Sequence, residues 1–423
     1  MHIAFFAMPS PGHVYPTLGI VAELTRRGHR VSYSITERLQ EAVVEAGAHP
    51  VLRELGLKPG ATTISRNLTG SDFVGFMGGQ LDQLEAIYPV LSEAFAGDEP
   101  DLVVCEGSTL SWEGPLLADR WGVPVVHTFP TFASNEHWSL GNYMPRMSLA
   151  NRLRSLAFVM RLVKLLKSID ARLKADDLLN GTHPPQARLA YFPRAFQFAG
   201  ETFDESYNFV GPCFNERAFQ GSWEQPADPD RRLVVVTIGS GQWDWPEFFP
   251  ACVAAVADLP WRFVIAVGGR NGPRRLDLGP VPENIEFHQW IPLQSLLPQA
   301  DLLICSAGMG SAMESMYHGV PVLAIPHVAD QFGVADRIVE LGLGRKLAPE
   351  ETDARSLREA VMGILGDEQV RGNVREMQSL VRDAGGPAAA ADIIEQVQKQ
   401  TSDHERPSRP DQGTRRRLRA LVR

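Results

Sequence analysis

The sequence has few cysteines, no excess of positive charge and no long apolar run. Each of these absences excludes a class of protein. The cysteines are Cys105, Cys213, Cys252 and Cys305. They are far apart and form no Cys-x-x-Cys pair, so the sequence indicates neither a structural zinc site nor a disulfide framework. The net charge of −9 argues against a general nucleic-acid-binding protein. Because we find no signal sequence and no apolar run of about 18 residues, we expect a cytoplasmic protein.

The apolar content that is present suffices for two hydrophobic cores. The chain has 423 residues, 44% of them hydrophobic, which predicts two domains of about 200 residues each. We place the first domain at 1–211, a polar, proline-bearing linker at 212–230, and the second domain at 231–398, whose last helix could pack back on the first domain. Residues 399–423 are rich in Arg and Pro, which predicts a disordered basic tail.

Strand-like apolar runs alternate with helical patterns, and this alternation predicts an α/β fold with parallel, doubly wound sheets. The strands predicted in the first half are 3–7, 29–35, 50–53, 102–105 and 123–128. After the first of these we expect a loop at 9–16 and a helix from about 17 to 27, ended by Gly28. Residues 55–95 and 130–185 are less regular, and such insertions at strand ends are where a pocket for a small molecule is built. In the second half we predict a strand at 233–240 and, near the C-terminus, helices at 353–366, 368–383 and 387–398.

One segment of the second insertion carries apolar residues at helical spacing among several cations. The apolar residues are Leu153, Leu156, Met160 and Val163, and the cations are Arg152, Arg154, Arg161, Lys164 and Lys167. Two interpretations stay open. The segment could contact an anionic membrane surface, or, as we favour, it could form a helix that covers the first core and is solvated on its other face.

The most informative stretch is 290–331, which predicts one β-α-β unit. A strand at 301–305 leads through a turn at 306–311 into a helix that carries Glu314, and a second strand follows at 321–325. Glycines in the turn let the backbone approach an anion, and the first amides of the helix point toward it. The turn therefore suits a phosphate group.

Side chains around this turn suit a nucleotide. Glu314 lies one helical turn inside Ser311, where a carboxylate can accept hydrogen bonds from a ribose, and Trp290 offers a face for a base. Gly308 and Gly310 alone are a weak signal, because many strand-to-helix turns need glycine only for close packing. The ordered set of residues, rather than the glycines, predicts a nucleoside-diphosphate site.

A histidine near the N-terminus is the candidate catalytic base. His13 lies in the predicted loop after the first strand, at the carboxyl edge of the sheet, where open α/β folds bind ligands. An imidazole there can accept a proton from a hydroxyl group near neutral pH. On position alone, a histidine that merely hydrogen-bonds its own loop is the more common case.

Two sets of residues resemble family 1 UDP-glycosyltransferases, particularly the bacterial macrolide-glycosyltransferase group. One set is Trp290-Ile-Pro, the segment Ala-Gly-Met-Gly-Ser-x-x-Glu at 307–314, and Asp330-Gln331; the other is Pro-Gly-His-Val-Tyr-Pro at 11–16. The resemblance extends to about residue 395. It implies the GT-B fold, in which two Rossmann-like domains face each other across a cleft, with the acceptor in the first and a nucleotide-sugar in the second.

The resemblance also implies roles for individual residues. His13 matches the family's base, and at the position of the Asp that holds this base the chain has Glu106, which is longer by one methylene. A strand-end Glu exposed to water is the alternative. Asp330 and Gln331 match residues that bind hydroxyls of the sugar. The full donor-binding set that we expect is Ser240, Trp290, Ile291, Ser306, Gly308, Gly310, Ser311, Glu314, Asp330 and Gln331.

The chain departs from the family pattern at two positions of the donor site. Relatives have a His before the glycine turn, where its ring donates to the diphosphate, and this chain has Ser306. The Gln that usually follows Trp-x-Pro is replaced by Leu293, with Gln294 one place later. Both changes affect the expected contacts to the nucleotide more than the expected fold.

The expected activity is inverting transfer of a sugar, with a UDP-hexose as donor, to a hydroxyl of a small, largely apolar metabolite such as a macrolide. Turn amides, the helix dipole and the hydroxyls of Ser240, Ser306 and Ser311 would stabilise the departing diphosphate, so we expect no metal and no other cofactor. The expected partners are the acceptor and the nucleotide-sugar, without nucleic acid or membrane contact; a homodimer is possible. Three alternatives stay open: a deoxysugar or pentose donor on another base, a nucleotide-sugar epimerase, and a non-catalytic partner protein on the same fold.

Overall fold

The computed structural model describes residues 1–53, 70–107, 111–143, 148–179, 185–224, 228, 230–238, 245, 247–268, 278 and 280–403. The strands of the first half are β1 (His2–Phe6), β2 (Arg30–Ile35), β3 (His49–Leu52), β4 (Leu102–Glu106), β5 (Val125–Phe129), β6 (Ala187–Ala190) and β7 (Tyr207–Phe209). Those of the second half are β8 (Leu233–Thr237), β9 (Arg262–Ala266), β10 (Ile285–His288), β11 (Leu302–Cys305), β12 (Val322–Ala324) and β13 (Gly344–Lys346).

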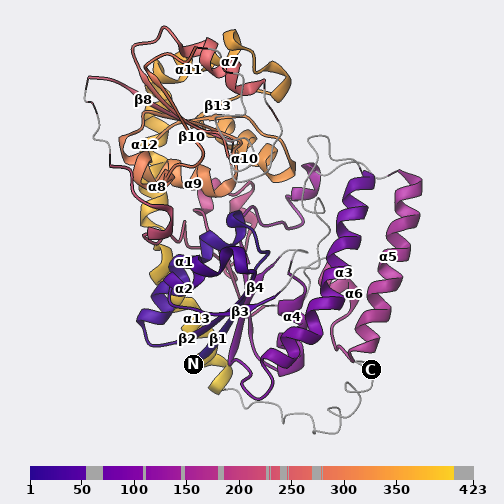
Figure 1. The fold of residues 1–423 in the computed structure, drawn as a ribbon. Helices are drawn as coiled ribbons and strands as arrows, with labels where there is room; N and C mark the ends of the chain where they lie inside the picture. Colours follow the sequence, from indigo (N-terminus) through magenta and orange to yellow (C-terminus); the bar gives the residue numbers. More distant parts are fainter. Residues whose placement is uncertain are drawn as a thin grey trace.

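Each half forms one parallel sheet with helices on both faces (Figure 1). The first sheet has the order β3-β2-β1-β4-β5-β6-β7 and the second the order β10-β9-β8-β11-β12-β13. Strands at the centre, such as β1, β4 and β11, are buried along their whole length, as apolar runs covered on both faces must be. The strand order reverses between β1 and β4 in one sheet and between β8 and β11 in the other, and ligands bind at such points in open α/β folds.

The helices that cover these sheets occur in chain order as follows. Those of the first half are α1 (Pro11–Arg26), α2 (Gln40–Glu45), α3 (Gly70–Ala94), α4 (Glu113–Trp121), α5 (Leu149–Ser168) and α6 (Ala175–Leu179). Those of the second half are α7 (Phe248–Val256), α8 (Leu293–Leu296), α9 (Met309–His318), α10 (Ala329–Glu340), α11 (Ala354–Leu365), α12 (Glu368–Asp383) and α13 (Gly386–Asp403). Asp353 is the N-cap of α11, where its side chain accepts a hydrogen bond from the Ser356 amide.

Two expectations for the first half are wrong. The predicted loop at 9–16 is the first part of α1, which begins at Pro11 although Pro16 lies inside it. Within the insertion predicted as irregular at 55–95, residues 70–94 form the long helix α3. Local rules treat proline and glycine as breaks in a helix, but burial of apolar side chains such as Val14 on α1 and Leu81 on α3 outweighs that cost.

The last helix, α13, returns to the first half and packs on α1 (Figure 1). Its buried residues Ala390, Ala391, Ile394 and Val397 belong to the same core as β1 and α1. Two ion pairs join the elements at the surface: Arg27 Nη1 lies 2.6 Å from Asp392 Oδ1, and His29 Nε2 lies 2.9 Å from Glu395 Oε1. The helix continues past the predicted end at 398, and residues 404–423 of the predicted tail lie outside the described residues.

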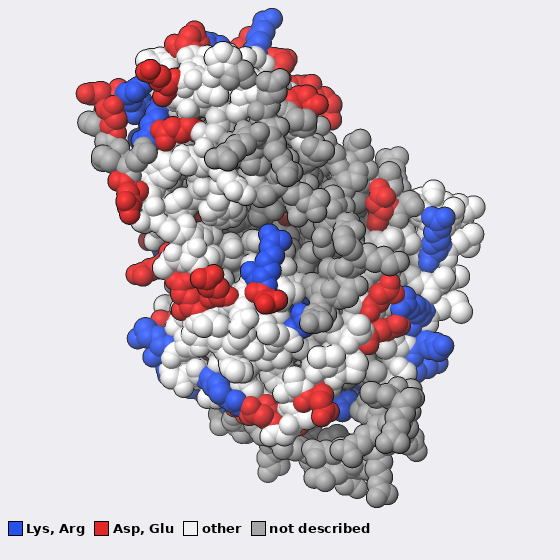
Figure 2. Space-filling view, in the orientation of Figure 1, with Lys and Arg blue, Asp and Glu red and all other residues white. Residues whose placement is uncertain are grey.

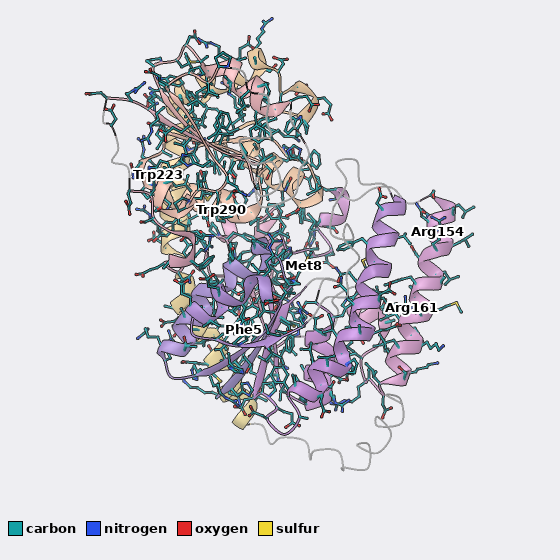
Figure 3. The ribbon with its side chains drawn as sticks, viewed as in Figure 1. Phe5, Met8, Arg154, Arg161, Trp223 and Trp290 are labelled. Carbon is teal, nitrogen blue, oxygen red and sulfur yellow. The ribbon has the colours of Figure 1, made fainter. Side chains whose placement is uncertain are left out.

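Helix α5 packs against α3 at the outer edge of the first half, where Figure 3 labels Arg154 and Arg161. Its Leu162 and Leu166 are buried, and Arg161 bridges to Asp82 and Glu85 of α3. The predicted apolar residues Leu153, Leu156 and Met160 instead face solvent, so the expected core-covering face does not include them. No helix in the described part of the chain is long and apolar enough to span a membrane.

Charged side chains of both signs are interspersed over the described part of the face in Figure 2. Lys and Arg side chains form no extended patch on the described part of that face.

Candidate functional site

A histidine and a carboxylate meet at the point where the strand order of the first sheet reverses. His13 lies in the first turn of α1, directly after β1, and Glu106 is the last residue of β4. Because β1 and β4 are neighbours in the sheet, the two side chains meet, and His13 Nδ1 donates to Glu106 Oε1 over 2.7 Å. Glu106 is only 2% exposed, so the alternative of a strand-end Glu exposed to water is wrong. With Nδ1 engaged in this way, the other ring nitrogen, Nε2, is the one that can accept a proton.

Charged groups from both halves of the molecule shift the pKa of His13. Burial lowers this pKa, but the charge of Glu106, its hydrogen bond and the charge of Asp330 raise it more, and the result lies above the ordinary value of 6.5. Burial raises the pKa of Asp330, and the positive charge of His13 lowers it in part. Asp330 lies in the first turn of α10 in the second half, so the two groups interact across the boundary between the sheets.

The glycine turn lies at the point where the strand order of the second sheet reverses, between β11 and α9. The backbone strain in this turn falls on Ala307, with φ of 57°, a left-handed conformation that side chains rarely adopt. Ser306 is buried, Gly308 is the N-cap of α9, and no described side chain caps the helix there. A Cβ at Gly308 or at Gly310 would meet nothing within 4 Å, so both glycines border open space. The uncapped amides of α9 point into this space and can bind an anion.

Glu314, which we expected to bind a ribose, is already bonded to an arginine of the predicted linker. Arg217 Nη1 donates to Glu314 Oε1 over 2.6 Å, and both side chains are 7% exposed. The Arg217 guanidinium also lies over the ring of Tyr15 on α1, 5.1 Å from its centroid. Sequence reasoning missed Arg217, because a single arginine in a polar segment carries no local signal.

Asp330 and Gln331 both lie in the first turn of α10, close after β12. The Gln331 side-chain oxygen accepts hydrogen bonds from the amides of His327 at 2.9 Å and Val328 at 3.3 Å, so it closes the start of the helix. Its amide nitrogen is the part of the side chain that can reach a ligand. His327, also missed from the sequence, is buried and has its ring edge-to-face with Trp245 at 4.9 Å.

The remaining predicted donor residues are Trp290, Ile291, Ser311 and Ser240. Trp290 is 48% exposed and lies near the boundary between the two halves (Figure 3). Ile291 is a core residue of the second half, so only its backbone is available to a ligand. Ser311 lies in the first turn of α9, and Ser240 lies outside the described residues. Among the described residues, no group of three or more His, Cys, Asp or Glu side chains is arranged to hold a metal ion.

Comparison with known proteins shows which family the chain resembles. Residues 251–397 match the family model of the erythromycin biosynthesis protein CIII-like C-terminal domain. The chain is 39% identical over 402 residues to demethyllactenocin mycarosyltransferase of Streptomyces fradiae, covering 93% of this chain and 86% of the relative. It is 34% identical over 419 residues to oleandomycin glycosyltransferase of Streptomyces antibioticus, covering 98% and 95%. The crystal structure of CalG4, the calicheamicin glycosyltransferase, matches with a TM-score of 0.79 and 35% identity, covering 95% of this chain and 98% of that one.

The two Rossmann-like sheets, together with these relatives, define a glycosyltransferase of the GT-B fold. The chain belongs to the family 1 glycosyltransferases, in the group of the macrolide glycosyltransferases.

Proposed function

We propose that the protein transfers a sugar from a nucleoside-diphosphate donor to a hydroxyl of a macrolide-like acceptor, with inversion at the anomeric carbon. The observation that carries the proposal is the hydrogen-bonded pair of the partly exposed His13 and the buried Glu106, which interacts electrostatically with Asp330 of the opposite half. A base in one half and a candidate sugar-binding carboxylate in the other are what direct transfer between two bound substrates requires.

In the proposed reaction, His13 Nε2 takes the proton of the acceptor hydroxyl. The hydroxyl oxygen forms a bond to the anomeric carbon from the face opposite the diphosphate, and the bond from that carbon to the diphosphate oxygen breaks. Glu106 stabilises the imidazolium that forms, as a buried carboxylate does for a base histidine. Asp330 and the amide of Gln331 bind hydroxyls of the sugar and hold the anomeric carbon in line.

The negative charge that develops on the leaving diphosphate is stabilised by the start of α9. The uncapped amides after Gly308, the dipole of α9 and the hydroxyl of Ser306 supply fixed donors in a partly buried site. In this proposal no metal takes part. We assign UDP-hexose as the donor, and Trp290 as the residue on which the base stacks.

A different nucleotide-linked sugar is the second candidate, and two observations favour it. Ser306 stands where relatives with the family motif have a histidine, and the relative from Streptomyces fradiae is by name a mycarosyltransferase. The names of these two relatives refer to macrolide antibiotics, and this supports a macrolide-like acceptor for this chain.

The test is product formation, followed by mass spectrometry, with UDP- and TDP-linked sugars and a panel of macrolide aglycones. We expect His13→Ala to lower the transfer rate by about 10² to 10⁴-fold while nucleotide binding is retained, because the base and the diphosphate lie in different halves. Wild-type turnover by His13→Ala would contradict the mechanism. Conversion of the donor in the absence of any acceptor would identify an epimerase instead.

A further inference from the structure

The ion pair between Arg217 and Glu314 is buried inside the proposed nucleotide site, and the mechanism above does not use it. The two side chains lie on different parts of the chain: Arg217 follows the last strand of the first sheet, and Glu314 is on α9 beyond the glycine turn. We propose that Arg217 is a positioning residue, which holds Glu314 Oε1 so that Oε2 accepts a hydrogen bond from a ribose hydroxyl of the donor. This inference rests on the proposed function.

The surroundings hold Arg217 in one place. Its backbone has φ of 44°, in the left-handed region, and its carbonyl accepts a hydrogen bond from the Gln220 amide over 2.9 Å. Its guanidinium lies between the rings of Tyr15, at 5.1 Å, and Phe214, at 5.9 Å. The two rings and the hydrogen bond to Glu314 therefore hold the guanidinium in place.

The linker also lies tightly on α1 before it reaches Arg217. A Cβ at Gly19 would collide with the carbonyl oxygens of Cys213 and Phe214, so glycine is required there for the linker to pass. Tyr15, which contacts the guanidinium, is on the same helix as His13, only two residues later. Arg217 is therefore held by the helix that carries the base while it bonds the carboxylate assigned to the ribose.

Glu314 needs such a partner to act as an acceptor. The Glu314 side chain is only 7% exposed, so it loses most of its hydration, and a buried carboxylate needs a hydrogen-bond partner in the protein. Without that partner, nothing among the described contacts fixes the orientation of its oxygens. The planar guanidinium of Arg217 bonds Oε1 and thereby orients Oε2.

The experiment compares nucleotides that differ only in their ribose hydroxyls. Isothermal titration calorimetry first measures UDP and TDP binding to the wild-type protein. The tighter-binding nucleotide is then compared with its counterpart without ribose hydroxyls, which is 2′,3′-dideoxy-UDP or 3′-deoxy-TDP. We expect the wild type to prefer the hydroxylated nucleotide by about tenfold or more, as for a hydrogen bond to a charged group.

Arg217→Gln should bring this preference down to about twofold or less, while the affinity for the deoxygenated nucleotide stays within about threefold of the wild type. The donor KM should rise much more than kcat falls. Arg262→Gln is the matched control. Arg262 also bonds a glutamate, Glu286, at 2.7 Å and lies over a ring, that of Trp223, but it is the first residue of β9 and has no contact with Glu314 among the described interactions. This control should keep the wild-type preference.

Two results would overturn the inference: an unchanged preference in Arg217→Gln, or equal loss of affinity for both nucleotides, which indicates a purely structural role. Arg217→Lys keeps a cation at this position and covers the case in which Arg217→Gln does not fold. The preference of Arg217→Lys for the hydroxylated nucleotide should fall at least threefold, or about 0.7 kcal/mol. An unchanged preference in this variant counts against the proposal. If the wild type binds neither UDP nor TDP, the proposed function itself fails and this inference with it.

Discussion

At the scale of single residues, Glu106 shows how a side chain longer by one methylene group can hold the proposed base. Glu106 stands where the family resemblance implies an aspartate, and its Oε1 accepts a hydrogen bond from His13 Nδ1 over 2.7 Å. The longer side chain reaches the ring because β4 and β1 are direct neighbours and His13 is in the first turn of α1 rather than in a flexible loop. The placement of the histidine on a helix therefore makes a glutamate suitable.

Replacing Glu106 by Gln should change both the rate and its pH dependence. Glu106 raises the pKa of His13 above 6.5, so the wild-type kcat/KM should fall as the pH decreases below that raised pKa, where the base is protonated. In Glu106→Gln the pKa of His13 decreases, so this acidic limb should move to lower pH, and the plateau should fall by about 10²-fold or more. A profile of kcat/KM between pH 5 and 9 measures both effects, and a variant with the wild-type profile would show that Glu106 does not act through His13.

At the scale of elements, the turn between β11 and α9 combines strain with empty space. Ala307 takes the left-handed conformation, whereas Gly308 and Gly310 do not, so these glycines are not needed for backbone freedom. The open space where a Cβ would project at both glycines is the feature that suits an anion. Glycine here leaves room for a ligand.

Gly310→Ala should therefore weaken nucleotide binding without lowering the stability of the fold. Outside the backbone of α9 itself, the added methyl group meets no atom of the described residues within 4 Å, so the free energy of unfolding should stay the same or rise by up to about 1 kcal/mol. The nucleoside-diphosphate affinity should nevertheless fall by about tenfold or more. The matched control is Gly372→Ala in α12, where an added Cβ also meets nothing within 4 Å and lies away from the turn. It should keep full affinity. Equal affinities of the two variants would show that the diphosphate does not lie against Gly310.

At the scale of the whole molecule, the two halves are joined by more than the linker. The chain passes from the first sheet to the second, and α13 then returns to pack on α1 and completes the first core. On the side of the site, Arg217 ties the linker to Glu314 of α9, and the charges of His13 and Asp330 interact between the two halves. The C-terminal helix is therefore part of the first core although it follows the second sheet in sequence.

This arrangement predicts that truncation of a buried side chain of α13, which leaves a cavity, destabilises the first half. Ile394 is fully buried against α1 and β1, so Ile394→Ala should lower the free energy of unfolding by about 2 to 5 kcal/mol. Urea denaturation followed by circular dichroism measures the change. Leu380→Ala on α12 is the control, because Leu380 is 43% exposed, and it should change stability by no more than about 0.5 kcal/mol. Similar effects of the two substitutions would mean that α13 is not part of that core.

The sequence alone determined the α/β class, most strands and the β-α-β unit around Glu314, because hydrophobic periodicity and turn chemistry act over a few residues. With the family resemblance it also indicated His13, Glu106 and the donor turn. It failed for the start of α1 and for α3, where buried contacts with distant strands outweigh local proline and glycine.

Only the tertiary structure decided which of these residues meet. His13 and Glu106 are 93 residues apart, and Arg217 and Glu314 are 97 apart, and each pair depends on strand order or on the path of the linker. The tertiary structure also turned the Gln331 oxygen inward as a helix cap and left Leu153, Leu156 and Met160 in solvent. No local pattern encodes such contacts, because they depend on how two sheets, a linker and a returning helix are packed together.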